Sequence, residues 1–130
     1  MDIVIDVSAL LAVIVGEPER DRIVELTTGH SLVGPGSIPW EIGNAFTAML
    51  KQRRLRLEDV QQGLSIFQSI PIRYLAVDLS KAVNIAHAAN LYAYDAYFLD
   101  CALRHTAPLI TLDQTLLRAA NKMGVSTLEV

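Results

Sequence analysis

Short apolar runs alternate with longer helical patterns along the whole chain. The first run, Ile3–Ile5, is β-branched and shows no polar alternation, which is typical of a central strand of a parallel sheet. Four more strands are predicted from similar runs, at residues 31–33, 72–77, 108–111 and 125–128. Because helical patterns separate these strands, the sequence predicts an α/β fold with a mostly parallel sheet.

The clearest helical pattern begins near Pro39, after the turn sequence Gly34-Pro35-Gly36. Its core-facing stripe has the i, i+3, i+4, i+7, i+8 spacing and consists of Ile42, Ala45, Phe46, Met49 and Leu50. Ser37 is predicted to cap this helix. Further helices are predicted at residues 9–15, from Pro18 to before Gly29, and at 57–69, 79–90, 95–105 and 114–123. Gly63 is expected to weaken the middle of the helix over 57–69.

The composition is that of a globular protein. The 130 residues are 52% hydrophobic and 19% charged, so we expect one domain over residues 1–130 with a substantial core. Mean hydropathy is +0.33, yet no apolar run approaches the roughly 20 residues of a membrane span. The first residues lack a basic leader, and the single cysteine, Cys101, excludes an internal disulfide. These features fit a cytoplasmic protein with no membrane partner.

The net charge of −3 argues against a protein that holds nucleic acid by bulk positive charge. It is compatible with an enzyme that binds nucleic acid through a local basic patch and a metal ion. The candidate chemistry is therefore sought in local groups of residues.

Four acidic residues stand where an α/β sheet places its ligands. Asp6 and Asp113 follow predicted strands, Asp95 opens a predicted helix, and Glu41 lies in the first turn of another. Strand ends and helix starts share one edge of a parallel sheet, so the four carboxylates are expected to converge. Acids held together repel one another and need a cation, and hard oxygen ligands suit Mg²⁺ or Mn²⁺. Such a site can activate water for attack on a phosphodiester.

Each of these acids also has a purely local interpretation. Asp is a leading N-cap residue, so Asp6, Asp95 and Asp113 can each be explained as a helix cap. Glu41 is harder to explain in this way, because it borders the apolar stripe of its helix, where an acid is partly desolvated. The hydroxyl groups of Ser8 and Thr111 are either caps or groups that position the acids and metal-bound waters.

Four segments, in order along the chain, carry a family resemblance. They are Val-Ile-Asp6-Val-Ser8-Ala-Leu-Leu-Ala, Pro39-Trp-Glu41-Ile-Gly-Asn-Ala, Tyr94-Asp95-Ala-Tyr-Phe-Leu and Leu-Ile-Thr111-Leu-Asp113. The chain resembles the PIN-domain ribonucleases over its whole length, and most closely the VapC-type toxins of bacterial and archaeal toxin–antitoxin pairs. The resemblance implies a three-layer α/β/α fold with a mostly parallel central sheet of about five strands.

The same resemblance implies a metal-dependent endoribonuclease. Asp6, Glu41, Asp95 and Asp113 would be the catalytic residues and would hold Mg²⁺ or Mn²⁺, with an activated water attacking the RNA. It also implies a toxin that a cognate antitoxin inhibits, and a homodimer.

Two other functions are compatible with parts of the sequence. Phosphoryl-transfer enzymes of the dehalogenase or receiver type also place an Asp after the first strand. Dehalogenase-type enzymes have a second Asp two residues later, where this chain has Ser8, and receiver-type chains have a Lys after a late strand, which is absent from residues 108–113. A PIN-like domain that binds RNA or protein without cleavage is the third possibility, and four intact acids argue against it.

Basic and aromatic side chains are secondary candidates for RNA contact. The basic run, which either contacts phosphates or forms a solvated face, consists of Lys51, Arg53, Arg54 and Arg56. The aromatic residues, which either stack on bases or pack in the core or a dimer interface, are Trp40, Tyr92, Tyr94 and Tyr97.

One short stretch departs from the family pattern. The family usually has small apolar residues where this chain has Asp100-Cys101. Asp100 lies about 140° around the helix from Asp95, so we interpret it as a surface or interface residue paired with Arg104. Cys101 is interpreted as a small packing residue.

Overall fold

A computed structural model describes residues 1–130 and shows strands alternating with helices along the chain. The strands are β1 (Asp2–Ile5), β2 (Ser31–Pro35), β3 (Ile72–Leu75) and β4 (Leu109–Ile110). The helices are α1 (Val7–Val15), α2 (Arg20–Thr27), α3 (Ile38–Lys51), α4 (Leu57–Ser69), α5 (Leu79–Ala89), α6 (Ala93–His105) and α7 (Gln114–Lys122). All strand pairs are parallel, in the order β3-β2-β1-β4.

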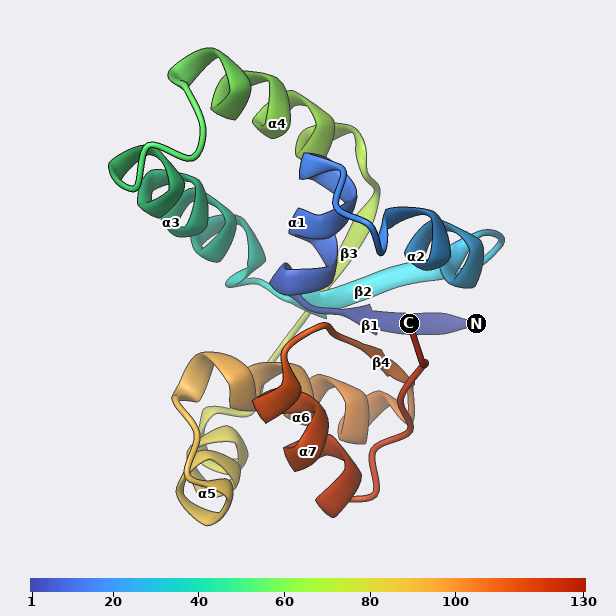
Figure 1. Ribbon diagram of the computed structural model, residues 1–130. Coiled ribbons are helices and arrows are strands. Elements are labelled where there is room, and N and C mark those ends of the chain that lie inside the picture. Colours follow the sequence, from blue (N-terminus) through green and yellow to red (C-terminus); the bar gives the residue numbers. More distant parts are fainter.

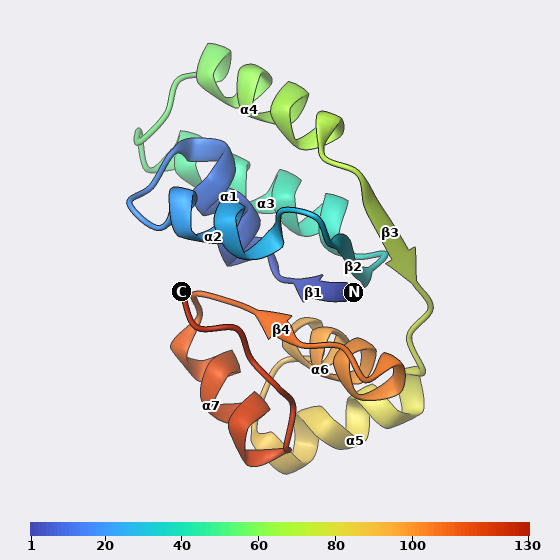
Figure 2. The ribbon, with the colours of Figure 1, turned by 90° about the vertical axis from the view of Figure 1, so that its right-hand side faces the viewer.

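Helices cover both faces of this sheet. Figure 1 shows α1, α2, α3 and α4 on one face and α5, α6 and α7 on the other, and the turned view in Figure 2 shows the same three layers. Because β1 is an inner strand of the sheet and lies between the two helix layers, Ile3, Val4 and Ile5 are almost completely buried. The predicted three-layer α/β/α fold and the buried first strand are thus confirmed.

The sheet has four strands where about five were predicted. The segment 125–128 contacts β4 through an isolated bridge between Leu109 and Thr127. Only Leu109 takes part, donating from its N–H to the Ser126 carbonyl and accepting from the N–H of Leu128. Pairing along a single residue does not make a strand, which explains the difference.

The helix boundaries agree with the predicted pattern to within a few residues. The start of α6 is the informative exception, because Tyr92 occupies the N-cap and Asp95 lies within the first turn. The interpretation of Asp95 as an N-cap is therefore wrong.

Gly63 of α4 was predicted only to weaken its helix, and the structure shows that it also permits close packing between helices. A Cβ at this position would lie 2.8 Å from Cζ of Phe46 and 3.3 Å from Cγ2 of Ile14. The missing side chain lets α4 approach the side chains of α1 and α3 closely.

The hydrophobic core is one connected cluster that includes residues from both helix layers. The predicted stripe on α3 contributes Ile42, Phe46 and Met49 to this cluster. Cys101 is also part of it, which confirms its packing role. No helix in the structure has both the length and the apolar character needed to cross a membrane.

Candidate active site

Asp6 is held at the point where β1 passes into α1. Its side chain is only 5% exposed, and each carboxylate oxygen accepts hydrogen bonds. Oδ1 accepts from the Ser8 hydroxyl at 2.7 Å and from the Ala9 N–H at 3.0 Å, and Oδ2 accepts from the Thr111 hydroxyl at 2.6 Å. The cap predicted for α1 is present, and the same carboxylate is fixed from the β4 side of the sheet.

The hydroxyl groups of Ser8 and Thr111 join the start of α1 to the segment after β4, which are distant in sequence. Ser8 Oγ accepts from the Leu112 N–H at 2.9 Å, and Thr111 Oγ1 accepts from the Asp113 N–H at 3.0 Å. Each hydroxyl therefore donates to Asp6 and accepts from the backbone of the β4–α7 connection. This network fixes Asp6 and Asp113 relative to each other, in agreement with a positioning role for both hydroxyls.

Asp113 caps α7, as its sequence position predicted. Its Oδ1 accepts from the N–H groups of Thr115 at 2.9 Å and Leu116 at 3.2 Å. The structure shows no hydrogen bond within the protein to Oδ2. One oxygen thus stabilises the helix while the other is free to bind a ligand.

Glu41 lies in the first turn of α3, where Ser37, a residue predicted to cap this helix, holds its side chain. Ser37 makes no capping bond, and its hydroxyl instead donates to Oε2 of Glu41 at 2.7 Å. A serine four residues before an acid at a helix start is the sequence signal for this pair. Glu41 lines a cavity of about 280 Å³, together with Trp40, Asn44, Tyr94 and two aliphatic side chains.

Electrostatics link these acids into one region. Burial raises the pKa of Asp6, an effect that the hydrogen bonds from Thr111, Ala9 and Ser8 oppose and the charge of Asp113 increases. Burial also raises the pKa of Asp95, and Asp113 adds to this. The pKa of Glu41 rises to about 7, chiefly through burial, with the Ser37 hydrogen bond opposing the rise and the charges of Asp95 and Asp6 adding to it.

The four carboxylates have no basic partner in the protein. None of the ion pairs in the structure involves any of them. The structure also contains no group of three or more acidic, histidine or cysteine side chains placed to hold one ion directly. The region is thus an acidic surface with uncompensated charge, and its oxygen donors are the kind that Mg²⁺ or Mn²⁺ selects. Mg²⁺ keeps several waters and needs only one or two direct carboxylates, so these residues fit such an ion.

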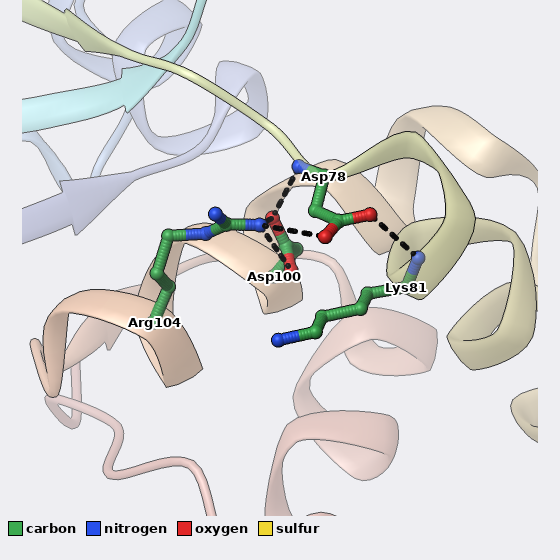
Figure 3. Close-up of polar contacts among 4 residues, drawn as sticks. All are labelled: Asp78, Lys81, Asp100 and Arg104. Atoms are coloured by element: carbon green, nitrogen blue, oxygen red, sulfur yellow. Dashed lines mark hydrogen bonds and ion pairs between the residues drawn. The ribbon is translucent and has the colours of Figure 1, made fainter.

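Asp100 lies outside this region, and its predicted surface position is wrong. It is 3% exposed, because α5 packs against the side of α6 that carries it. Figure 3 shows its carboxylate accepting from the Asp78 N–H at 3.1 Å and from Arg104 at 3.0 Å. The predicted Arg104 pair is confirmed, and it is part of a buried connection between α6 and the start of α5.

The aromatic residues at this edge are mostly exposed. Trp40 is 77% exposed and Tyr92 and Tyr94 are also exposed, so a core-packing role for these three is wrong. Tyr94 contacts Tyr97 edge to face, with ring centroids 5.7 Å apart. Trp40 and Tyr94 line the Glu41 cavity, where exposed aromatic faces are available to a ligand.

The basic run is solvent-exposed at the far end of α3 and in the loop that follows. Arg56 pairs there with Glu58 and Asp59 at the start of α4. Because Glu41 lies in the first turn of α3 and Lys51 in its last, the run and the acidic region are at opposite ends of one helix. A contact between the run and RNA remains a prediction.

Comparison with known proteins places this chain in a family. The profile of the PIN domain matches residues 3–122, and the chain belongs to the PIN domain family. This confirms the predicted resemblance. PIN domains are generally nucleases, so the predicted general class, a hydrolase, agrees with membership of the family.

Two solved structures resemble the chain in fold. PAE2754 from Pyrobaculum aerophilum has a TM-score of 0.67 at 22% identity, covering 92% of this chain and 87% of its own. VapBC2 from Rickettsia felis, determined bound to a DNA fragment from its promoter, has a TM-score of 0.66 at 14% identity, covering 98% of each chain. A comparison with curated protein sequences gave no match.

Proposed function

We propose that this chain is a metal-dependent endoribonuclease acting as the toxin of a toxin–antitoxin pair. Membership of the PIN family sets aside the phosphoryl-transfer alternative. The observation that carries the proposal is the acidic region, in which four carboxylates at one edge of the sheet interact electrostatically and have no cationic partner. Such a region is unfavourable for a protein unless a cation or a proton compensates it. Residues 1–130 would act as a single PIN-like domain.

In the proposed reaction, Asp6, Glu41, Asp95 and Asp113 would hold Mg²⁺ or Mn²⁺, one or two of them directly and the others through bound waters. The ion would supply a water of lowered pKa and would stabilise negative charge on the scissile phosphate. Asp6 is the most rigid of the four, since three hydrogen bonds fix its carboxylate before any ligand binds. A carboxylate that needs no rearrangement contributes preorganised charge to the site.

The proposed role of Glu41 is to bind the ion as a charged carboxylate. Burial raises its pKa to about 7 in the metal-free protein, and a bound cation would lower the pKa again, so ion binding would be coupled to release of a proton near neutral pH. The Ser37 hydroxyl keeps Oε2 in place and leaves Oε1 without a hydrogen bond in the protein. Trp40 and Tyr94, which line the same cavity, would stack on unpaired bases beside the cleaved bond.

The proposed partners are an RNA substrate, a cognate antitoxin and a second copy of this chain in the cytoplasm. Support for the antitoxin is the fold shared with VapBC2, together with the sequence resemblance to VapC-type toxins. Expression of the chain alone in bacterial cells should arrest growth, and the Asp95→Asn variant should not. Equal arrest by both proteins would contradict a toxin that acts through this site.

The catalytic proposal is tested on total bacterial RNA with the purified chain. Cleavage should require Mg²⁺ or Mn²⁺, stop with EDTA and fall on the order of 100-fold or more in Asp95→Asn. Asp21→Asn, an exposed acid in the first turn of α2, is the matched control and should cleave normally. Cleavage that survives both EDTA and Asp95→Asn would refute the metal mechanism. RNA binding without cleavage in any metal would favour the non-catalytic alternative.

A further inference from the structure

A second cavity lies beside the acidic region, between α7 and the end of α5. Its volume is about 470 Å³, and its wall is formed by residues of α7 and of the α5–α6 turn. Thr115, Arg118, Ala119 and Lys122 line it from α7, at spacings that place them on one face of the helix. Figure 2 shows α7 beside α5 in the lower helix layer.

The charge of this cavity is opposite to that of the acidic region. Arg118 and Lys122 form no ion pair, and no acidic residue lines the cavity. Arg118 has one polar contact within the protein, a bond of 3.5 Å to the Thr115 hydroxyl. The chain as a whole has a net charge of −3, whereas this groove carries two unpaired positive charges.

The groove begins close to Asp113 of the acidic region. Its first lining residue on α7, Thr115, donates its N–H to the carboxylate of Asp113. At a rise of about 1.5 Å per residue, Arg118 lies about 8 Å and Lys122 about 14 Å along α7 from Asp113. A strand bound at the acidic region therefore reaches both cations within a few nucleotides.

The remaining wall matches the other chemical parts of a nucleotide. Small and apolar side chains, including Ala89 and Ala119, also line it, together with Asn90. Phosphates on basic side chains, with sugars and bases on apolar surface, are the usual pattern of single-strand binding. The basic run at Lys51–Arg56 is less suited to this role, because it lies at the opposite end of α3 from Glu41.

We propose that this groove is a binding site for backbone phosphates of single-stranded RNA, with Arg118 and Lys122 as the phosphate ligands. This assignment rests on the proposed function. It adds the path along which the RNA leaves the acidic region. Arg118 binds a phosphate near the scissile one and Lys122 binds a phosphate further along the strand, and these contacts hold the strand in register although the acids repel it. The contact carries no sequence information, so any sequence preference comes from elsewhere.

The test measures binding apart from cleavage. A fluorescent 12-nucleotide oligouridine is titrated in EDTA with wild type, with Arg118→Ala/Lys122→Ala and with the equal-charge control Arg20→Ala/Lys81→Ala, at two exposed cations outside any proposed binding site. We expect the α7 variant to bind on the order of 10-fold more weakly and the slope of log Kd against log salt to fall by about 1.4, the value for two phosphates. Arg118→Lys/Lys122→Arg should restore most of the binding. Thermal melting checks that all variants are folded.

Three results would overturn the groove assignment. These are no RNA binding by wild type, equal losses in the α7 and control variants, and a preference for an oligoglutamate probe over the RNA. None of them depends on cleavage, so they are distinguishable from failure of the proposed nuclease. If the groove is correct and the nuclease is not, the α7 variant loses binding and no RNA is cut in any metal.

Discussion

The raised pKa of Glu41 predicts that replacing this acid stabilises the metal-free protein. The pKa is 4.5 for an unperturbed Glu and about 7 in the fold, mainly because the carboxyl group is partly buried. Between these two values the folded state binds more protons than the unfolded state, so stability falls as the pH rises. Above pH 7 the full cost of the charged form is present. Glu41→Gln removes that cost and keeps an oxygen that can accept from Ser37.

The magnitude follows from the size of this pKa difference. At 1.36 kcal/mol per unit it corresponds to at most about 3.4 kcal/mol, and solvent screening of a half-buried group reduces this to about 1.5 kcal/mol. For a chain of this length that is a rise of about 5 °C in Tm at pH 8. At pH 4, where the wild-type side chain is also neutral, the two Tm values should coincide.

The assay is thermal melting of wild type and Glu41→Gln at pH 4 and pH 8, each with EDTA and with Mg²⁺. Glu17→Gln, an exposed acid outside the site, is the matched control and should leave Tm unchanged at both pH values. Saturating Mg²⁺ should narrow the gap at pH 8, because a bound cation favours the charged carboxylate. A shift of the same size at both pH values, or none at pH 8, would refute the reasoning.

Three further predictions concern the groups around the site. Thr111→Val leaves Asp6 Oδ2 and the Asp113 N–H without their partner, so it should lower stability by about 1–3 kcal/mol in denaturant titrations and reduce cleavage, while Thr111→Ser retains both. Asp100→Asn weakens the buried contact with Arg104 and should lower stability by about 1–3 kcal/mol, with no effect on metal affinity measured by calorimetry. Gly63→Ala forces a methyl against Phe46, and we expect a net loss of about 1 kcal/mol despite the better helix propensity, so an equal or higher Tm would contradict the packing account.

The parts of the site that the sequence predicted are those that depend on local order along the chain. Asp6 and Asp113 follow strands and precede helices, and in a parallel sheet that position alone assigns them to one edge. The caps of α1 and α7 follow for the same reason. Glu41 and Asp95 were expected at the same edge because they lie at helix starts, and the family resemblance is what pointed to a shared role, since periodicity does not show which helices are neighbours.

The features that the sequence did not predict depend on contacts between distant segments. Helical spacing showed that Asp100 points away from Asp95, but only the packing of α5 on α6 makes that side buried. The pair of Ser37 and Glu41 is a local exception, because the two residues are four apart: Ser37 was predicted to cap α3, and its hydroxyl donates to the Glu41 carboxylate instead. The segment 125–128 has the composition of a strand, but it pairs with β4 only through one isolated bridge and is therefore not a strand.

The central claim is that these carboxylates together bind a divalent ion, and manganese anomalous scattering from crystals grown with Mn²⁺ tests it most directly. We predict a manganese peak at about 2 Å from oxygens of one or two of the carboxylates of Asp6, Glu41, Asp95 and Asp113, with waters completing its coordination. Crystals of Asp95→Asn should show a much weaker peak. A chain that cleaves RNA while its crystals show no manganese at this edge of the sheet would contradict the account.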